Sequence, residues 1–385
     1  MNDRQLARLH GIADFRDAAR RVLPRMVFDY VDGAAGLETT ARANRDAFDR
    51  VRLVPSGPVD VSRRSTATTL FGAPLALPLL IGPTGLASAL WPRGEVALAR
   101  AAARAGIPFV LANASSVSLE DVRAASDGRQ WFQLYLPPER ERALPWLDRA
   151  RDRYEAIELT VDTALPGLRN RDMRNTFAMP FRWSAAKLLD IALHPRWACR
   201  MAPHGTPLPQ LLLTPAGSAS GRFATQGEAN RAKLSTSLGW DDVRWLRDQW
   251  RGRLLVKGLT DVRHAPQALA SGIDGIVIST HGGRQLDGAV SSLEVLPEFV
   301  AAIGGRMPIL VDSGFRTGSD IAKALALGAT AVQIGRPTLY ALAVAGEAGV
   351  DRALALLAAE FDTAMALCGA TDPSKLDAAS IRGRP

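Results

Sequence analysis

Residues 272–287 read GIDGIVISTHGGRQLD. The apolar run at 276–278 has the composition of a buried strand in a parallel sheet, and it ends abruptly in polar residues. His281 and Arg284 follow beside two glycines, which let a ligand approach the backbone. The pattern is suited to a base and an anion clamp over one small substrate. A Gly-rich turn with a solvated histidine and arginine is the alternative reading, and the remainder of the chain has to decide between them.

Seven further apolar runs of this kind recur along the chain. They are LALPLLIGPTG (75–85), IPFVLAN (107–113), WFQLYL (131–136), AIELTVDT (156–163), RLLVKGL (253–259), PILVDSG (308–314) and AVQIGRP (331–337). Stretches of helical period separate most of them, as at 93–106, 261–272 and 318–329. The alternation favours a parallel α/β fold, and eight repeats favour a closed (β/α)₈ TIM barrel over an open doubly wound sheet. No G-x-G-x-x-G follows the first strand, which argues further against a dinucleotide fold.

Two segments interrupt this rhythm within what we expect to be a single domain, residues 1–385. Residues 1–55 have apolar positions at spacings of three and four and predict a helical cap ahead of the barrel. The fourth and fifth strands are separated by far more chain than a crossover needs, so an insertion over 164–235 is expected to project from the catalytic end. Its part at 213–230 is rich in small and polar residues and predicts a mobile loop.

The segment FRWSAAKLLDIALHPRWACRM (181–201) of this insertion is amphipathic. Leucines and tryptophans form one side, and Lys187, Arg196 and Arg200 are available for a polar edge. Such a segment either lies on an anionic bilayer or packs over the barrel mouth as a lid, and the residues leave both open.

Composition narrows the class of partner. The 385 residues carry a net charge of +8, but the basic residues form no long run and only 6% of the chain is aromatic, so we expect no nucleic-acid partner. Cys199 and Cys368 are too far apart to suggest a metal pair or a disulfide framework. The first residues lack the apolar core of a signal peptide and no stretch is long enough to span a membrane, so we expect a cytoplasmic protein, or one peripheral on the inner face of the cytoplasmic membrane.

Polar groups end nearly every predicted strand, where a barrel of this kind builds its active site. In chain order these ends offer Pro83, Thr84, Gly85, Ala112, Asn113, Gln133, Tyr135, Thr160, Asp162, Lys257, Ser279, His281, Arg284, Asp312, Gly314, Arg316, Gly335 and Arg336. The last two ends each place glycine and arginine ahead of a helix, which is typical of a phosphate site. A phosphorylated cofactor is therefore expected, with Lys257 placing positive charge beside a reducible ring.

These residues belong to motifs that resemble the FMN-dependent α-hydroxy acid dehydrogenases and oxidases. The resemblance runs over nearly the whole chain, through FDYVDGAAG, LLIGPTGL, WFQLY, LTVDT, GLRNRDMRN, LLVKGL, STHGGRQLD, DSGFRTGSD, KALALGA, IGRPTLYALA and GEAGV. Within the family, the segments at 59–65, 82–94 and 193–197 are most similar to the mandelate dehydrogenase branch. The resemblance implies FMN as the cofactor, a small 2-hydroxy acid as substrate and a homotetramer as the assembly.

The resemblance also implies a role for each site residue. His281 would be the base and Asp162 its partner, with Arg169 and Arg284 on the substrate carboxylate, Tyr30 beside them and Tyr135 on the hydroxyl oxygen. The FMN contacts would be Pro83, Thr84, Gly85, Gln133, Thr160, Lys257, Ser279, Asp312, Gly314, Arg316, Gly335 and Arg336.

Three positions bear on how the activity would differ within the family. Ala112 stands where a serine is usual and Thr280 where an asparagine is usual, so two hydrogen-bonding groups are missing or shortened. Gly85 stands where oxygen-using members carry alanine. We therefore expect oxidation of an (S)-2-hydroxy acid, mandelate-like, with electrons passed to a quinone or another carrier. The alternatives are an oxidase that produces hydrogen peroxide, and a flavin-binding protein without turnover.

Overall fold

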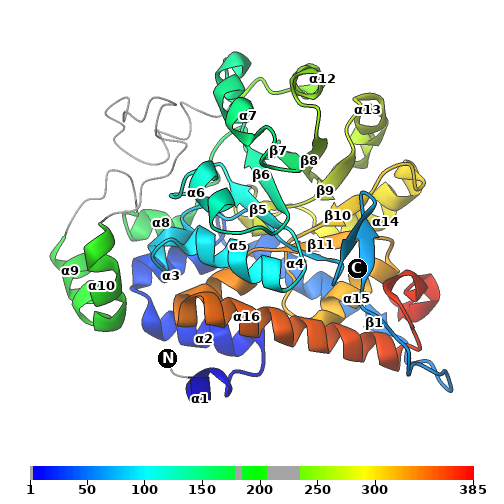
Figure 1. The fold of residues 1–385 in the computed structure, drawn as a ribbon, viewed down its shortest axis with the longest axis horizontal. Helices are drawn as coiled ribbons and strands as arrows, with labels where there is room; N and C mark the ends of the chain where they lie inside the picture. The colour runs from blue at the N-terminus through cyan, green and yellow to red at the C-terminus, as the bar shows by residue number, and fades with distance from the viewer. Residues whose placement is uncertain (1–2, 178–183, 206–234) are drawn as a thin grey trace.

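The computed structural model describes residues 3–177, 184–205 and 235–385, and at its centre eight parallel strands close into a barrel (Figure 1). The strands are β4 (Leu79–Ile81), β5 (Phe109–Ala112), β6 (Gln130–Leu134), β7 (Ala156–Thr160), β8 (Arg253–Leu259), β9 (Gly275–Ile278), β10 (Ile309–Val311) and β11 (Ala331–Ile334). They follow one another around the barrel in chain order, and β11 pairs with β4 to close it. Seven of the strands fall within the predicted runs and β6 begins one residue before its run, so the predicted (β/α)₈ barrel is confirmed.

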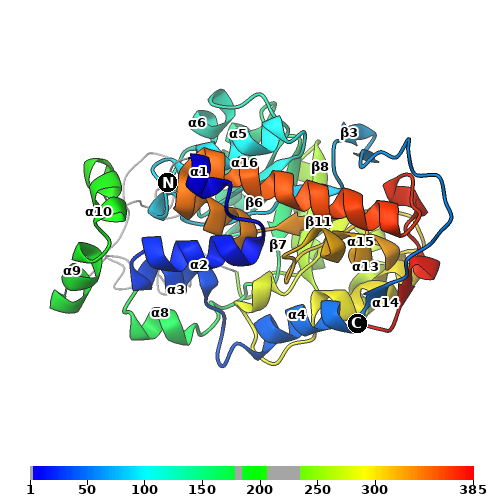
Figure 2. The same cartoon turned by 90° about the horizontal axis from the view of Figure 1, so that it is seen from below.

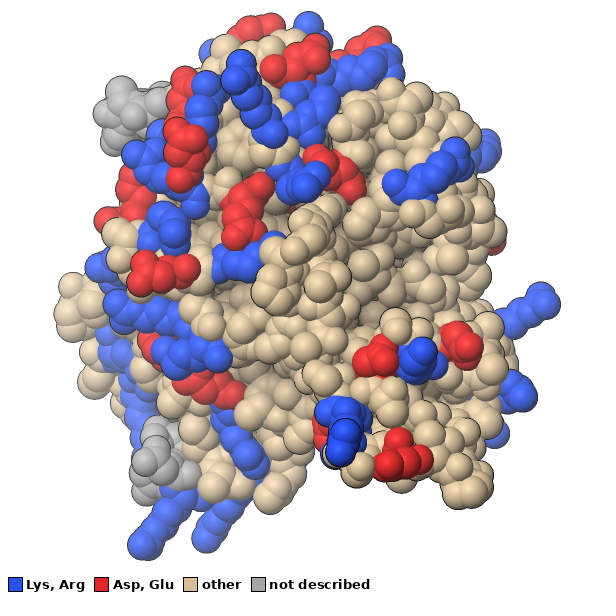
Figure 3. Space-filling model, turned by 45° about the vertical axis from the view of Figure 1, so that its right-hand side comes forward, with Lys and Arg blue, Asp and Glu red and all other residues tan. Residues whose placement is uncertain are grey.

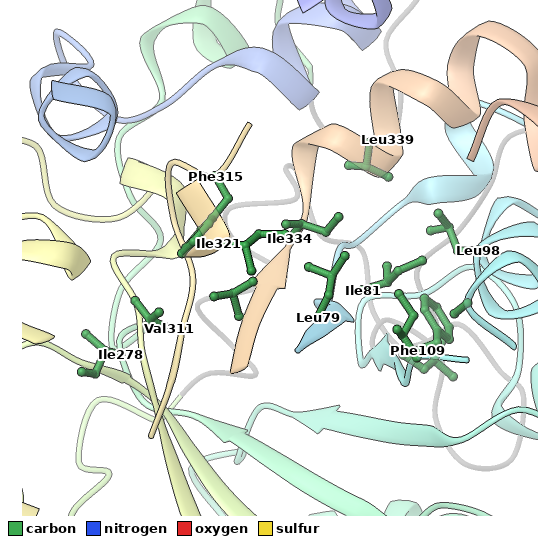
Figure 4. Close-up of a cluster of buried hydrophobic side chains, with 14 of the residues drawn as sticks. Leu79, Ile81, Leu98, Phe109, Ile278, Val311, Phe315, Ile321, Ile334 and Leu339 are labelled. Atoms are coloured by element: carbon green, nitrogen blue, oxygen red, sulfur yellow. The ribbon is translucent and has the colours of Figure 1, made fainter. Parts of the chain in front are cut away.

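Helices surround the barrel because alternate strand residues point outward and are apolar. The helices are α5 (Gly94–Arg104), α6 (Leu119–Ala124), α7 (Leu144–Ala150), α12 (Trp240–Gln249), α13 (Ala265–Ala270), α14 (Ser292–Ile303), α15 (Gly318–Ala326) and α16 (Arg336–Leu367). Figure 4 shows the outer core around Ile81, with Leu98 of α5 and Leu339 of α16 packed beside the strands. Side-chain caps mark the starts of α6, α14 and α15, as where the Thr317 hydroxyl accepts from the backbone N–H of Asp320 before α15.

The inward-facing residues form a separate apolar layer at the amino-terminal ends of the strands. This layer contains Leu80, Val110, Trp131, Ala156, Leu255, Val277, Leu310 and Ala331, one from each strand. The hairpin of β2 (Thr68–Leu70) and β3 (Ala73–Leu75) packs beneath it, with the ring of Phe71 5.9 Å from that of Trp131. Two residues further along each strand, the next inward-facing positions lie toward the carboxyl ends of the strands.

The predicted N-terminal cap is present as four helices. They are α1 (Asp3–Leu6), α2 (Ile12–Val22), α3 (Arg25–Asp32) and α4 (Thr39–Arg50). Helix α2 packs along α16, as Figures 1 and 2 both show. The short strand β1 (Arg52–Leu53) then pairs with β12 (Ile381–Arg382), which ties the end of the cap to the last residues of the chain.

The insertion after β7 contains α8 (Asn170–Arg174), α9 (Ala185–Ala192) and α10 (Pro195–Met201). The expected amphipathic segment 181–201 is thus two helices, because Pro195 begins a new one, and its residues 181–183 and the expected loop at 213–230 lie outside the described residues. Figures 1 and 2 show α9 and α10 at the edge of the molecule. Within the described ranges, no helix is both long and apolar enough to cross a bilayer.

One residue of this segment does not lie where the sequence suggested. Lys187 was expected on a polar edge, but its side chain is buried and its ammonium donates to the carbonyl of Thr176 at 3.0 Å. The expectation for Lys187 is therefore wrong, because the long side chain turns back toward the chain that leads into α9. Leu188, Leu189 and Leu193 are instead 53%, 62% and 70% exposed.

The surface shown in Figure 3 mixes the two signs of charge. Lysine and arginine side chains lie between aspartates and glutamates, next to a broad area without charged residues. Many of the arginines are in ion pairs, such as Arg64 with Asp362. The positive net charge is therefore locally balanced on this face rather than gathered into a basic stripe.

Candidate active site

A cavity opens at the carboxyl ends of the barrel strands and encloses about 1430 Å³, its open mouth included. It brings together sixteen of the eighteen predicted site residues: Tyr30, Pro83, Thr84, Gly85, Gln133, Tyr135, Thr160, Arg169, Lys257, His281, Arg284, Asp312, Gly314, Arg316, Gly335 and Arg336. The other two, Asp162 and Ser279, lie directly behind the wall, where they contact His281 and Lys257. Segments from residue 30 to residue 336 therefore meet at one site.

His281 lines the cavity, and a carboxylate supports it from behind. Nδ1 of His281 lies 3.1 Å from Oδ1 of Asp162, and this contact leaves Nε2 as the ring nitrogen for a ligand. Asp162 can come this close because residue 258 is glycine: a Cβ there would lie 2.7 Å from that of Asp162. Gly258 has φ +106° at an irregularity in the pairing of β8 and β9. His281 itself has φ +55°, a conformation that costs energy for a residue other than glycine and is typical of functional sites.

The residues just before His281 hold its backbone. The hydroxyl of Ser279 accepts from the His281 N–H at 3.0 Å and from Lys257 Nζ at 2.5 Å. The hydroxyl of Thr280 accepts from the side-chain amide of Asn44 at 2.8 Å, so Thr280 is tied to helix α4. Asn44 was not predicted as a site residue, because nothing in its local sequence shows that α4 packs against this strand end.

Two arginines and two tyrosines lie near one another in the same cavity. Arg284 donates through Nη1 to the carbonyls of Tyr30 and Gly33, and its guanidinium carbon is 5.0 Å from the centre of the Tyr30 ring. Arg169 is 6.0 Å from the same ring centre and is paired with Asp172. Burial, with repulsion from Arg169, lowers the pKa of Arg284 to about 10, which keeps it a cation at neutral pH.

Both phenols remain protonated donors in this setting. Burial raises the pKa of Tyr30 and of Tyr135 above the ordinary value of a tyrosine. A small carboxylate entering here would meet two partly buried cations and two phenol hydroxyls, groups that suit a carboxylate.

A second group of basic residues lies after β10 and β11. Arg316 is partly buried just before α15, and burial lowers its pKa. Arg336 donates to the carbonyls of Val31, Gly282 and Gly33, so it braces the N-terminal cap as well as lining the cavity. Gly314 has φ +92°, and a Cβ there would lie 2.4 Å from the Asn44 carbonyl oxygen. Backbone and guanidinium groups at a helix start suit a phosphate.

Other polar residues of the strand ends form the floor of the cavity. Lys257 is paired with Asp312, and although burial lowers its pKa, the carboxylates of Asp312, Glu158 and Asp162 outweigh that effect and raise it. Among the described residues, Nε2 of Gln133 and the hydroxyls of Thr160 and Thr84 have no hydrogen-bond partner although they are buried. Unpaired buried donors are costly, so they fit a planar polar ligand whose acceptors would meet them.

Sequence reasoning missed several residues of this floor. The hydroxyl of Ser313 accepts from the Gly282 N–H at 3.0 Å and donates to Asp312. Gln333 of β11 lines the cavity, and Glu158 of β7 lies beneath it with no exposed surface. Glu158 and Gln333 could have been found from the sequence. Each places a charged or amide side chain within an otherwise apolar strand, in the runs AIELT and AVQI.

A barrel cavity lined by a carboxylate-paired histidine, several arginines and a buried lysine fits a flavin-dependent oxidoreductase of small acids. A model of the FMN-dependent dehydrogenase family matches residues 19–383, and the chain belongs to that family. It is an FMN-dependent enzyme that oxidises the CH–OH group of 2-hydroxy acids.

Known proteins resemble the chain over nearly its full length. The (S)-mandelate dehydrogenase of Pseudomonas putida is 47% identical over 369 residues, which cover 96% of this chain and 92% of the relative. An L-lactate dehydrogenase of Caulobacter vibrioides is 42% identical, covering 94% and 95%. The solved structure of a monotopic membrane protein, (S)-mandelate dehydrogenase, superposes with a TM-score of 0.91 at 45% identity, covering 98% of this chain and 100% of that one.

Proposed function

We propose that this protein oxidises an (S)-2-hydroxy acid with an aromatic side chain, such as mandelate, to the 2-oxo acid and passes the electrons to a quinone-type acceptor. The observation that carries this proposal is the His281–Asp162 pair at 3.1 Å in the same cavity as Arg169 and Arg284. That arrangement supplies a base and a carboxylate clamp for one small acid. The higher identity to the mandelate relative than to the lactate relative supports the aromatic substrate.

In this proposal each group has one task. Bound FMN would supply the two-electron acceptor, taking the α-hydrogen together with its electron pair as a hydride. His281 takes the proton of the hydroxyl group at Nε2, and Asp162 fixes the tautomer and stabilises the imidazolium. Arg169 and Arg284 bind the carboxylate, Tyr30 donates to it, and Tyr135 donates to the hydroxyl oxygen.

The remaining predicted residues would hold the cofactor. We assign Arg316, Arg336, Gly314 and Gly335 to the phosphate and Asp312 to the ribityl chain. Pro83, Thr84, Gly85, Gln133, Thr160, Ser279 and Lys257 would contact the ring system, with Lys257 on its pyrimidine side. The unpaired donors of the floor support this fit, because the polar edge of the ring would satisfy them.

Helices α9 and α10 support a peripheral contact with a membrane, where a quinone would be met. Trp197 donates to the carbonyl of Ala89 at 3.0 Å, and Arg200 stacks over the Trp91 ring at 3.7 Å, so α10 is fixed to the body of the protein. The exposed leucines of α9 then remain available to lipid. Binding to anionic vesicles should fall when Leu188 and Leu189 are both changed to serine. Leu367→Ser, at a residue 64% exposed on α16, is the matched control.

The decisive experiment is anaerobic. Mixing the yellow protein with (S)-mandelate should bleach its flavin, with slower bleaching by lactate and none by (R)-mandelate, and His281→Ala should abolish bleaching. A colourless protein that binds no FMN, or one bleached by none of these acids, would sink the proposal. Hydrogen peroxide formed at the rate of turnover would instead select the oxidase alternative, which differs only in the acceptor.

We also propose that residues 1–385 form a single domain and that the chain assembles as a homotetramer. Light scattering on the purified holoenzyme measures the mass directly, and a mass other than four times 41.3 kDa would reject the tetramer.

A further inference from the structure

Glu158 points into the barrel, where a carboxyl group is unusual. Its neighbours Ile157 and Leu159 belong to the outer core, and Ala156 belongs to the inner layer, so Glu158 faces inward by the alternation of the strand. It lies in the inward-facing layer next above the apolar layer that contains Ala156. None of its surface is exposed.

Its hydrogen bond spans the barrel. Oε2 accepts from Nε2 of Gln333 at 2.5 Å, and Gln333 lies on β11, which is opposite β7 in the closed order of eight strands. Gln333 also lines the cavity. The bond therefore crosses the interior in the inward-facing layer that also holds Lys257 and Gln133, just above the apolar layer.

The pair can serve both protonation states of the acid. Among the described residues, Oε1 of Glu158 and Oε1 of Gln333 have no hydrogen-bond partner. An amide offers a donor to a carboxylate and an acceptor to a carboxylic acid, so a turn of the Gln333 amide lets it bond Glu158 either way. The geometry does not oblige Glu158 to stay ionised.

The surrounding charges leave Glu158 without a cation of its own. The titratable groups that act on it are Lys257 on β8, Asp312 after β10 and Asp162 after β7, while Gln133 and Gln333 are neutral. Lys257 is already paired with Asp312. An ionised Glu158 would add an unmatched negative charge beneath the cavity, and burial, partly offset by Lys257, raises its pKa to about 7.

We propose that Glu158 is a positioning residue that couples the reduction potential of bound FMN to pH. When Glu158 is protonated, the positive charge of Lys257 is free to stabilise the reduced ring. When Glu158 is ionised, its negative charge offsets that of Lys257 and lowers the reduction potential of FMN. The inference rests on the proposed placement of the FMN ring over Lys257, and it needs no assumption about the substrate.

The test compares the holoenzyme with Glu158→Gln, in which the amide keeps the shape and can still bond Gln333. Each protein is equilibrated anaerobically with a redox dye of known potential, which supplies the two electrons, and the flavin spectrum gives the ratio of reduced to oxidised FMN. At pH 5.5 the two ratios should agree. At pH 8.5 the ratio should be roughly tenfold higher in Glu158→Gln, as expected for one charge about 10 Å away in a protein interior, or about 30 mV for a two-electron couple.

Two further variants separate this role from a structural one. For wild type, the ratio of reduced to oxidised FMN should change with pH where Glu158 ionises. Gln333→Leu removes the hydrogen-bond donor to ionised Glu158, so in this variant the change should occur at higher pH. Glu155→Gln, an exposed glutamate just before the same strand, should leave this pH dependence unchanged. A constant ratio between wild type and Glu158→Gln across pH would overturn the inference. Such a result would leave the proposed oxidation intact, because bleaching by hydroxy acids is measured separately.

Discussion

Asp162→Asn tests whether the negative charge of Asp162 stabilises protonated His281 during the reaction. The substitution keeps the size of the side chain and its distance of 3.1 Å from Nδ1 but removes the negative charge. At an effective dielectric constant of 20, a full charge pair over this distance is worth about 5 kcal/mol. The side chains are 26% and 14% exposed, and solvent screening reduces this to about 2–3 kcal/mol. At 1.36 kcal/mol for each factor of ten, we expect a loss of roughly 30- to 160-fold in kcat/KM.

The assay is rapid anaerobic mixing with (S)-mandelate, followed through the flavin absorbance. FMN content should stay at the wild-type level, because Asp162 lies behind the cavity wall and not in it. Asp362→Asn, which breaks the surface pair with Arg64, is the matched control and should leave the rate unchanged. A loss of less than threefold in Asp162→Asn would refute the idea that the carboxylate stabilises a protonated His281 in the transition state.

Three other substitutions test the floor and the wall of the cavity. Lys257→Met leaves the Asp312 carboxylate without its cation and should lower the free energy of unfolding, measured by urea denaturation, by about 3–5 kcal/mol. Adding Asp312→Asn should restore part of this loss. Gly85→Ala places a methyl group 3.1 Å from the Cβ of Ala114 and should raise the share of electrons that reach oxygen, measured as peroxide per turnover. The pKa of Glu158 is about 7 in the folded chain, against an ordinary 4.5. As pH rises from 4.5 to 7, wild type should therefore lose about 3 kcal/mol of unfolding free energy relative to Glu158→Gln. An equal pH dependence of unfolding in the two proteins would contradict this.

The barrel was predictable because its signal is local and repeated. Each strand is a short apolar run, and the polar residue at its end marks the face where the site forms. Those ends also gave most of the predicted site residues that line the cavity, since parallel strands bring their carboxyl ends together, whereas Tyr30 and Arg169 lie outside the strand ends. Strand lengths were overestimated at the C-terminal ends, as for β10, where the run 308–314 contains a strand of only Ile309–Val311, because the glycine-rich turns after the strands are also partly buried.

What sequence reasoning missed depends on which side chains meet across the fold. The contact of Asn44 with Thr280 joins α4 to the end of β9, and no local pattern reports it. Lys187 was assigned to a polar edge because lysines usually reach solvent, whereas here the chain before α9 provides a carbonyl acceptor. The period of a helix predicts which residues share a face but not what that face contacts.

The two inward layers of the barrel indicate that the presence of Glu158 has a functional reason, because it does not stabilise the fold. The lower layer is apolar on every strand and packs as a core, so it can supply stability without polar groups. The upper layer carries Lys257, which Asp312 already neutralises, and a second buried carboxyl gains no cation of its own there. Replacing an unmatched buried charge with an apolar residue usually stabilises a protein. A glutamate at residue 158 therefore costs stability above its pKa, and that cost is consistent with the proposed role, in which its charge changes the potential of bound FMN.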